Sequence, residues 1–308
     1  MTDSSADSSA ARSAYTTGIG LALVTIVLFS LKGIFAKFAY RHGVDAVSMM
    51  GLRMAFAFPF FAAVALWLRR GPPLTPLTKR DFLSVGLLGF VGYFLASWLD
   101  FLGLEYVTAG MERLLLFIFP TLVVLLSAFF FAKPIGVREV AALVTTYAGV
   151  ALVVTGALGT GQNKNIVLGA AFVFASAIGY AVYLVFGSET IKRVGAMRFT
   201  AYAMMIAAVP AILMWVVRRP HEVFALPAQA YGWCLTLAVF STVVPLFCQS
   251  AALKRIGANQ FALLGALGPV CTILIGYIAL GERLAAMQWA GAAAVVAGVM
   301  IVTLKPAK

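Results

Sequence analysis

The chain has 308 residues, of which 62% are hydrophobic and only 11% charged, and its mean hydropathy is +0.98. A soluble domain usually carries about 25% charged residues, and no soluble core could bury this much apolar surface. The net charge of +12 does not indicate a nucleic-acid partner, because the Lys and Arg residues lie in short loops beside apolar runs and not on one basic face.

Residues 1–17 are rich in Ser, Ala, Thr and Asp and are predicted to form a disordered tail. Beyond them, apolar runs follow one another, and several reach the roughly 20 residues that a helix needs to cross a bilayer. A β-barrel would instead show alternating segments of about 10 residues. The sequence therefore predicts an all-α integral membrane protein with ten transmembrane helices, at residues 18–39, 46–68, 82–104, 108–131, 137–158, 166–187, 199–217, 229–250, 257–280 and 285–304.

The 23 Lys and Arg residues divide unevenly between the two sides of these spans. Three lie well inside spans, six lie in loops or at span ends on one side, and the remaining fourteen lie on the other side. Because cytoplasmic loops carry the excess of Lys and Arg, we expect a multi-pass protein of the inner cell membrane with both termini in the cytoplasm. Residues 305–308 would form a short cytoplasmic tail.

The sequence repeats itself weakly at an offset of 149 residues. The matched residues are Gly20 with Gly169, Arg69 and Arg70 with Arg218 and Arg219, Pro120 with Pro269, and Gly149 with Gly298. The offset divides the chain into two five-helix repeats, 18–158 and 159–304. Because five is odd, the second repeat must enter the membrane from the opposite face, and inverted repeats are typical of transporters that work by alternating access.

The stretch from Ala109 to Pro120 is echoed by Ala258 to Pro269, and Leu280-Gly281-Glu282-Arg283 follows the second copy. With ten helices in two units, the chain resembles the drug/metabolite transporter superfamily, and within it the ten-helix metabolite exporters that release aromatic amino acids. The resemblance implies a central cavity lined by helices 1, 3, 4, 6, 8 and 9. Small four-helix members couple to protons through a glutamate in helix 1, but this chain has Lys32 and no acid there, so that coupling chemistry does not carry over.

Five ionisable residues stand out well inside the spans, at Lys32, Arg53, Asp100, Glu112 and Arg113. Each costs about 2.5 to 3.5 kcal/mol near the bilayer centre and therefore indicates a specific role. All are predicted at one level, which suggests a paired network with one positive charge left over. We expect Lys32, with Arg113, to bind a substrate carboxylate while Glu112 or Asp100 faces an ammonium group. The alternative is a structural salt-bridge cluster, or side chains that reach the nearer interface.

Aromatic residues with polar tips form a second group. Tyr93 and Ser97 share one face of helix 3 with Asp100, Trp98 lies on the adjoining face, and Tyr180 and Tyr183 lie together on helix 6. These side chains suit a binding cavity for a flat apolar ring. Alternatively, Trp98 belongs to the aromatic belt at the membrane interface.

Two prolines, Pro120 and Pro269, occupy corresponding places in helices 4 and 9. They are predicted to kink these helices and to act as hinges during transport. In helix 10, Gly291 and Gly298 permit close helix packing, either within the chain or across a homodimer.

The sequence thus predicts a secondary transporter that exports small amphipathic metabolites, most of all neutral or aromatic amino acids. A multidrug or nucleotide-sugar carrier is the alternative within this class, and a membrane-embedded enzyme is the alternative outside it. The partners expected are a small-molecule substrate and the lipid bilayer. No catalytic, metal or cofactor motif is visible, since no His, Asp or Glu cluster has metal-ligand spacing.

Overall fold

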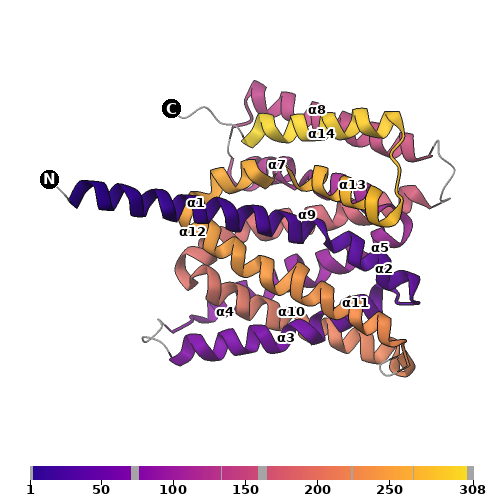
Figure 1. Ribbon diagram of the computed structural model, residues 1–308, viewed down its shortest axis with the longest axis horizontal. Helices are drawn as coiled ribbons and strands as arrows, with labels where there is room; N and C mark the ends of the chain where they lie inside the picture. The colour runs from indigo at the N-terminus through magenta and orange to yellow at the C-terminus, as the bar shows by residue number, and fades with distance from the viewer. Residues whose placement is uncertain are drawn as a thin grey trace.

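The computed structural model describes residues 3–70, 76–132, 134–158, 165–222, 225–265 and 267–303, and within these ranges it contains helices and no strand (Figure 1). The first half consists of α1 (Asp3–Ser30), α2 (Lys32–Arg41), α3 (Ala46–Arg70), α4 (Lys79–Gly89), η1 (Phe90–Leu95), α5 (Ala96–Tyr106), α6 (Ala109–Leu116), α7 (Phe119–Phe131) and α8 (Val137–Leu158). The second half consists of α9 (Ile166–Val194), α10 (Ala196–Arg218), η2 (Pro220–Glu222), α11 (Ala228–Ala238), η3 (Val239–Val243), α12 (Val244–Gly265), α13 (Leu267–Leu280) and α14 (Ala286–Thr303).

These helices match the ten predicted spans. Eight helical stretches of the described chain are long and apolar enough to cross a membrane, and the shorter apolar helices Leu267–Leu280 and Ala286–Ile301 stand where the ninth and tenth spans are expected. Helix α1 begins at Asp3, within the segment predicted to be a tail, whereas residues 305–308 lie outside the described residues. The protein is therefore an all-α membrane protein with a ten-helix architecture.

The eighth and ninth spans differ from the prediction in their boundary. Lys254 and Arg255 suggested a loop between them, but α12 continues through these residues to Gly265. Lys and Arg are good helix formers, so a basic pair does not by itself end a helix. The guanidinium of Arg255 donates to the carbonyl of Ala251 one turn earlier, at 2.9 Å, as it does on a continuous helix.

The two halves run in opposite directions and interleave. In Figure 1, α1 and α2 cross from left to right, while α9, the first helix of the second half, crosses from right to left. The extensive helix contacts pair the halves: α1 packs along α12, α3 along α10, α5 along α9 and α8 along α14. Numbered by span, these pairs are 1 with 8, 2 with 7, 3 with 6 and 5 with 10. If each span is replaced by its equivalent in the other half (1 by 6, 2 by 7, and so on), the same four pairs result. This is the arrangement of two inverted repeats.

Two π-helical segments mark the same point in each repeat. The first, η1, begins at Phe90 and the second, η3, begins at Val239, which is 149 residues later. The two π-helical segments are therefore separated by the same 149 residues as the repeats in the sequence. Segments with π-helical bonding are often found at functional sites, and these two interrupt the third and eighth spans.

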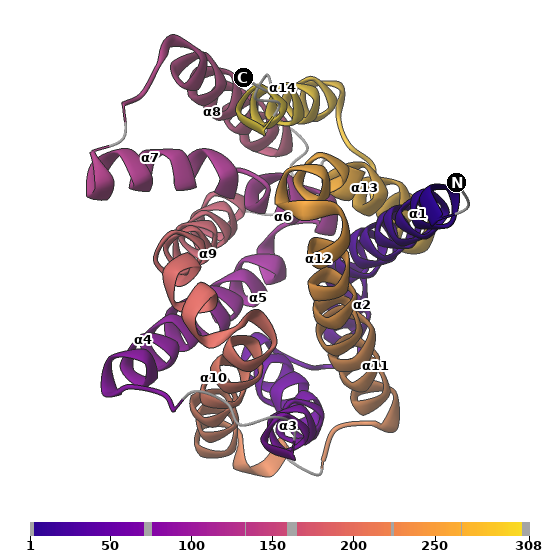
Figure 2. The ribbon, with the colours of Figure 1, turned by 90° about the vertical axis from the view of Figure 1, so that its left-hand side faces the viewer.

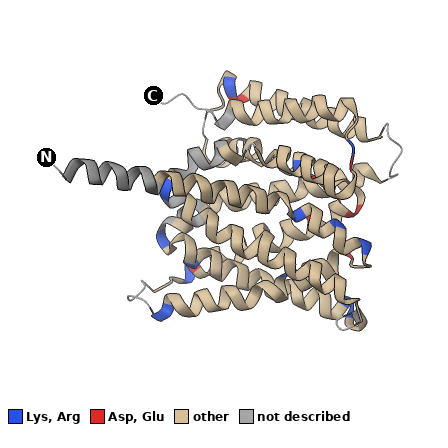
Figure 3. Cartoon of the chain, in the orientation of Figure 1, with Lys and Arg blue, Asp and Glu red and all other residues tan. Residues whose placement is uncertain are grey.

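Charge and burial follow the pattern expected of a membrane protein. Charged residues gather at the two ends of the bundle, with an apolar band between them (Figure 3). Large apolar side chains lie on the outside of that band, as with Phe129 at 82% and Leu83 at 71% exposure, whereas Asp100 and Glu112 are buried. We call the end of the bundle where α3 ends, α4 begins and α14 ends the terminal end (left in Figure 1).

Close helix packing accounts for the glycines of the last span. A methyl group added to Gly291 or Gly298 of α14 would collide with the backbone of α8, where Gly149 provides the matching gap. These glycines therefore allow α8 and α14 of the same chain to pack closely against each other.

Candidate functional site

The first span is interrupted where its charged residue stands. Helix α1 ends at Ser30, Leu31 forms a turn, and α2 begins at Lys32. The second repeat holds this break in place, because the Ser30 hydroxyl donates to the carbonyl of Gly268 at 3.1 Å and the Thr272 hydroxyl donates to the carbonyl of Ser30 at 3.2 Å. Lys32 therefore projects from the start of α2, directly after a turn that α13 holds in place.

Lys32 forms ion pairs with two buried carboxylates. Its Nζ lies 2.5 Å from Oδ2 of Asp100 on α5 and 3.0 Å from Oε1 of Glu112 on α6. The side chains of Asp100 and Glu112 are only 3% and 1% exposed, and that of Lys32 is 16% exposed. The structure thus brings together three of the predicted site residues, as one ammonium group between two carboxylates.

The two arginines of the predicted network contact other groups. The guanidinium of Arg53 lies 5.1 Å from the centre of the Phe101 ring and donates to Thr242 Oγ1 at 3.5 Å. Arg113 lies against α13, since a methyl group at Gly268 would stand 2.8 Å from its Nη2 atom. Among the described residues neither arginine forms a salt bridge. The sequence suggested that the three cations share the two acids, but in the described part of the structure Lys32 alone forms ion pairs with both acids.

Several polar atoms near Lys32 are buried without a hydrogen-bond partner among the described residues. They are Oδ1 of Asp100, Nε of Arg53 and Nε of Arg113. Leaving a buried polar group unpaired costs about 1 to 3 kcal/mol, so a cluster of such groups marks a place where a polar ligand could bind.

The tyrosines form a neighbouring group. The hydroxyl oxygens of Tyr93 and Tyr183 are 2.9 Å apart, and the rings of Tyr180 and Tyr183 stack at 5.8 Å. Tyr180 is close enough to Lys32 and Arg113 for their charges to act on its hydroxyl, so this residue connects the two groups.

Trp98 and Ser97 lie beside these groups on α5. The Trp98 ring stacks on Phe94 at 6.2 Å, with its edge nitrogen buried, and Ser97 is half-buried. Both side chains face the protein interior at least in part.

The two predicted hinge prolines lie in α7 and α13, and Pro120 stands in the first turn of α7. Pro120 follows a break at Phe117 and Ile118 that separates α6 from α7, and Pro269 is the third residue of α13. Proline is well tolerated in a first turn because its missing N–H would be unpaired there anyway. The fourth span is therefore broken just before Pro120 and not merely bent at it.

Glu282 was not singled out as a site residue, although it belongs to the Leu-Gly-Glu-Arg motif. Its carboxylate accepts hydrogen bonds from the backbone N–H groups of Ala109 at 2.9 Å and Gly110 at 3.2 Å. These are the first N–H groups of α6, the helix that carries Glu112. A carboxylate at a helix N-terminus satisfies unpaired donors and also interacts favourably with the helix dipole. The motif thus fixes the start of a site helix from the opposite repeat.

The charged residues occur in one repeat only. At the positions 149 residues after Lys32, Asp100 and Glu112 the sequence has Ala181, Gln249 and Phe261. The fold is duplicated, but the ionic centre is not.

Comparison with known proteins agrees with this architecture. The sequence pattern of the EamA-like transporter family matches residues 16–155 and again residues 167–304, one match for each half. The chain belongs to the EamA-like transporter family. This confirms the resemblance to the drug/metabolite transporter superfamily.

Proteins similar in sequence to this chain are named as transporters. An uncharacterized transporter of Bacillus subtilis, YcbK, is 32% identical over 278 residues, covering 87% of each chain. A probable terminal-alkyne amino-acid exporter of Streptantibioticus cattleyicolor is 24% identical over 265 residues, covering 86% of this chain and 87% of the other. One crystal structure matches with a TM-score of 0.63 and 19% identity, covering 94% of this chain and 98% of the other, which supports the fold alone.

Proposed function

We propose that this EamA-like transporter exports small amphipathic metabolites, with neutral and aromatic amino acids as its substrates, by alternating access between its two repeats. We also propose that it lies in the inner cell membrane with both termini in the cytoplasm. The excess of Lys and Arg in the loops of the terminal end supports that orientation.

The observation that carries the proposal is the Lys32 ion pair with Asp100 and Glu112, surrounded by buried polar atoms that lack partners. A purely structural cluster gains most when every member is satisfied, because a partly satisfied buried network is costly. Here both charge types and several free donors meet at one point inside the membrane region. An amino acid carries a complementary carboxylate and ammonium group on adjacent atoms.

Such a substrate could bind without leaving a buried charge unpaired. Its carboxylate would take the place of one acid at Lys32, with Arg113 nearby as a second cation. Its ammonium group would pair with the acid that is released, Asp100 or Glu112. This exchange avoids the cost of about 3 to 5 kcal/mol that follows when one member of a buried ion pair loses its partner.

The neighbouring aromatic side chains support a preference for flat apolar substrates. Tyr93, Tyr180 and Tyr183 pack ring to ring beside the ionic centre, and Trp98 adds an indole N–H. Aromatic rings attract other rings by about 0.5 to 1.5 kcal/mol beyond simple burial. The relative named as a probable terminal-alkyne amino-acid exporter points to the same class of substrate.

The test is counterflow in liposomes that contain the purified protein. Vesicles loaded with unlabelled phenylalanine would be given labelled phenylalanine, leucine, UDP-glucose or ethidium outside. We expect exchange of the two amino acids, and a loss of at least tenfold in Lys32→Met. Lys37→Met is the matched control, since Lys37 lies five residues further along α2, donates to the Leu104 carbonyl at 2.6 Å and forms no ion pair with either acid among the described residues.

A folded Glu112→Gln protein provides a second variant, because it keeps the shape of the side chain and leaves the Lys32 pair with Asp100. We expect it to lose its preference for phenylalanine over phenylpropionate, which lacks the ammonium group. Full exchange by Lys32→Met would contradict the role of this residue. Exchange of only UDP-glucose or ethidium would contradict the amino-acid proposal.

A further inference from the structure

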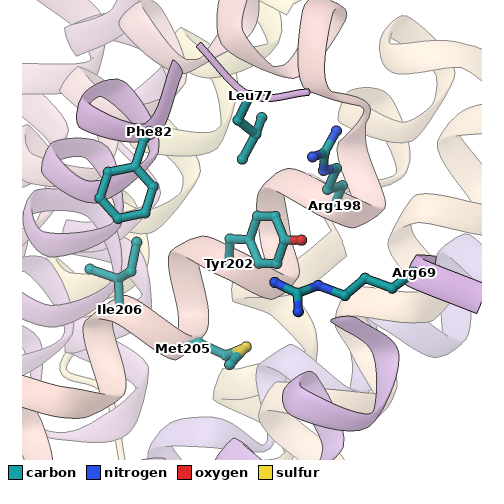
Figure 4. A pocket seen from close by; sticks show the side chains of 7 residues that line it. All are labelled: Arg69, Leu77, Phe82, Arg198, Tyr202, Met205 and Ile206. Atoms are coloured by element: carbon teal, nitrogen blue, oxygen red, sulfur yellow. The ribbon is translucent and has the colours of Figure 1, made fainter. Parts of the chain in front are cut away.

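A second feature lies away from the ionic centre, at the terminal end. A pocket of about 560 Å³ is lined by Arg69 of α3, by Leu77 and Phe82 at the start of α4, and by Arg198, Tyr202, Met205 and Ile206 of α10 (Figure 4). None of these residues belongs to the proposed substrate site. Two guanidinium groups and no carboxylate occur among the seven lining residues, so the pocket has a positive lining.

The polar part of the pocket is a converging pair of arginines. Arg69 and Arg198 come from different helices; the Arg69 side chain reaches toward the hydroxyl of Tyr202 in Figure 4, and the charges of both arginines act on that hydroxyl. The guanidinium of Arg198 also lies 5.7 Å from the centre of the Tyr202 ring. Asp81, the acid nearest in sequence to Arg69, is paired with Arg193 at 2.8 Å. Two guanidiniums that converge in this way match the geometry of a phosphate group.

The rest of the lining is apolar and continues along α10. From Arg198 and Tyr202 the same helical face leads through Met205 to Val209 and Leu213, which are 61% and 60% exposed. The face therefore begins with charge at the end of the bundle and becomes purely apolar toward the middle of the membrane. A free inorganic anion would use only the first part of this surface.

We propose that this pocket binds an anionic phospholipid, with the phosphate between Arg69 and Arg198 and one acyl chain along the exposed face of α10. The charge of the lining complements the headgroup, and the apolar face has the direction that a lipid tail takes from a membrane surface. Basic pockets between transmembrane helices on the cytoplasmic side suit such headgroups. The proposal does not depend on which substrate the protein carries.

The test is a titration of delipidated protein in detergent with fluorescently labelled phosphatidylglycerol and, separately, labelled phosphatidylcholine. We expect at least tenfold tighter binding of phosphatidylglycerol. Each basic residue near a membrane surface contributes about fivefold to the binding of anionic lipid, equivalent to about 1 kcal/mol, so Arg69→Gln/Arg198→Gln should weaken phosphatidylglycerol binding about 25-fold.

The control variant Arg70→Gln/Arg80→Gln removes the same charge at the same end, from exposed residues outside the pocket. It should retain wild-type affinity within twofold. Inorganic phosphate at 10 mM, compared with chloride at equal ionic strength, should displace no lipid. An unchanged preference in the pocket variant, an equal loss in the control variant, or displacement by phosphate would each overturn the proposal.

Discussion

Replacing Glu282 with alanine removes the acceptor for the first two backbone N–H groups of α6, and we expect it to destabilise the protein and impair transport together. The other early donors of this helix keep their partners, since Thr108 Oγ1 accepts from Met111 N at 3.2 Å and the Thr108 carbonyl accepts from Glu112 N at 2.9 Å. The effect of Glu282→Ala is therefore confined to two hydrogen bonds to a charged group.

Hydrogen bonds to charged groups contribute about 1.5 to 3 kcal/mol each, and a carboxylate at a helix N-terminus adds about 0.3 to 1 kcal/mol. Glu282 is half-buried, so water recovers part of this energy when the side chain is removed. The net loss should be about 2 to 3 kcal/mol, with a melting temperature lower by several degrees. Because Glu112 lies in the first turn of α6, its distance from Lys32 should also become less well defined.

The assay is thermal unfolding of the purified protein in detergent, followed by the counterflow measurement. Glu139→Ala is the matched control: Glu139 also accepts from a backbone N–H at a helix start, that of Gly136 at 3.0 Å, but within one exposed turn. It should cost no more than about 1 kcal/mol. If both variants melted at the same temperature and exchanged phenylalanine equally well, the bracing role of Glu282 would be refuted.

Two further perturbations test separate parts of the molecule. Replacing Pro120 and Pro269 with alanine together should slow counterflow several-fold while leaving substrate affinity within about twofold, because alanine supplies the backbone N–H that proline lacks and lets helical hydrogen bonding extend across these points; equal rates would argue against hinges. Asp45→Asn should lower the melting temperature slightly at pH 7 and by a smaller amount at pH 3. Partial burial acts to raise the pKa of Asp45, but hydrogen bonds from Ser48 and Arg219 hold it below its ordinary value of 3.8. The charged form is thus favoured in the folded state, and its contribution is present above about pH 4 and disappears as the pH falls through the lowered pKa. An equal difference at both pH values would show that charge is not involved.

The architecture was accessible from the sequence because the bilayer imposes strong rules on it. Long apolar runs of this kind form helices there, and the offset of 149 residues reveals the duplication in the sequence itself. The same rules indicated Lys32, Asp100 and Glu112, since charges inside a span are rare and costly.

Other features of the site depend on contacts between residues far apart in the chain, which the spacing of residues along the sequence does not predict. The spacing of the sequence does not show which of Lys32, Arg53 and Arg113 pairs with the two acids. In the structure Lys32 follows the turn at Leu31 and contacts both acids, whereas Arg53 lies against the Phe101 ring. The bond between Glu282 and α6 joins residues more than 170 positions apart. The π-helical segments arise from local changes in hydrogen bonding that ordinary apolar sequence can adopt.

The interleaving of the halves has a consequence for biosynthesis. Viewed along the bundle in Figure 2, helices of the first half stand beside helices of the second around the assembly, so spans 1, 2, 3 and 5 reach the bilayer before their main packing partners exist. The ionic centre is the exception, because Lys32, Asp100 and Glu112 all lie within the first 112 residues and can neutralise one another as soon as the fourth span is inserted. The nascent chain therefore need not hold bare charges in lipid while it waits for the ribosome to finish the second half.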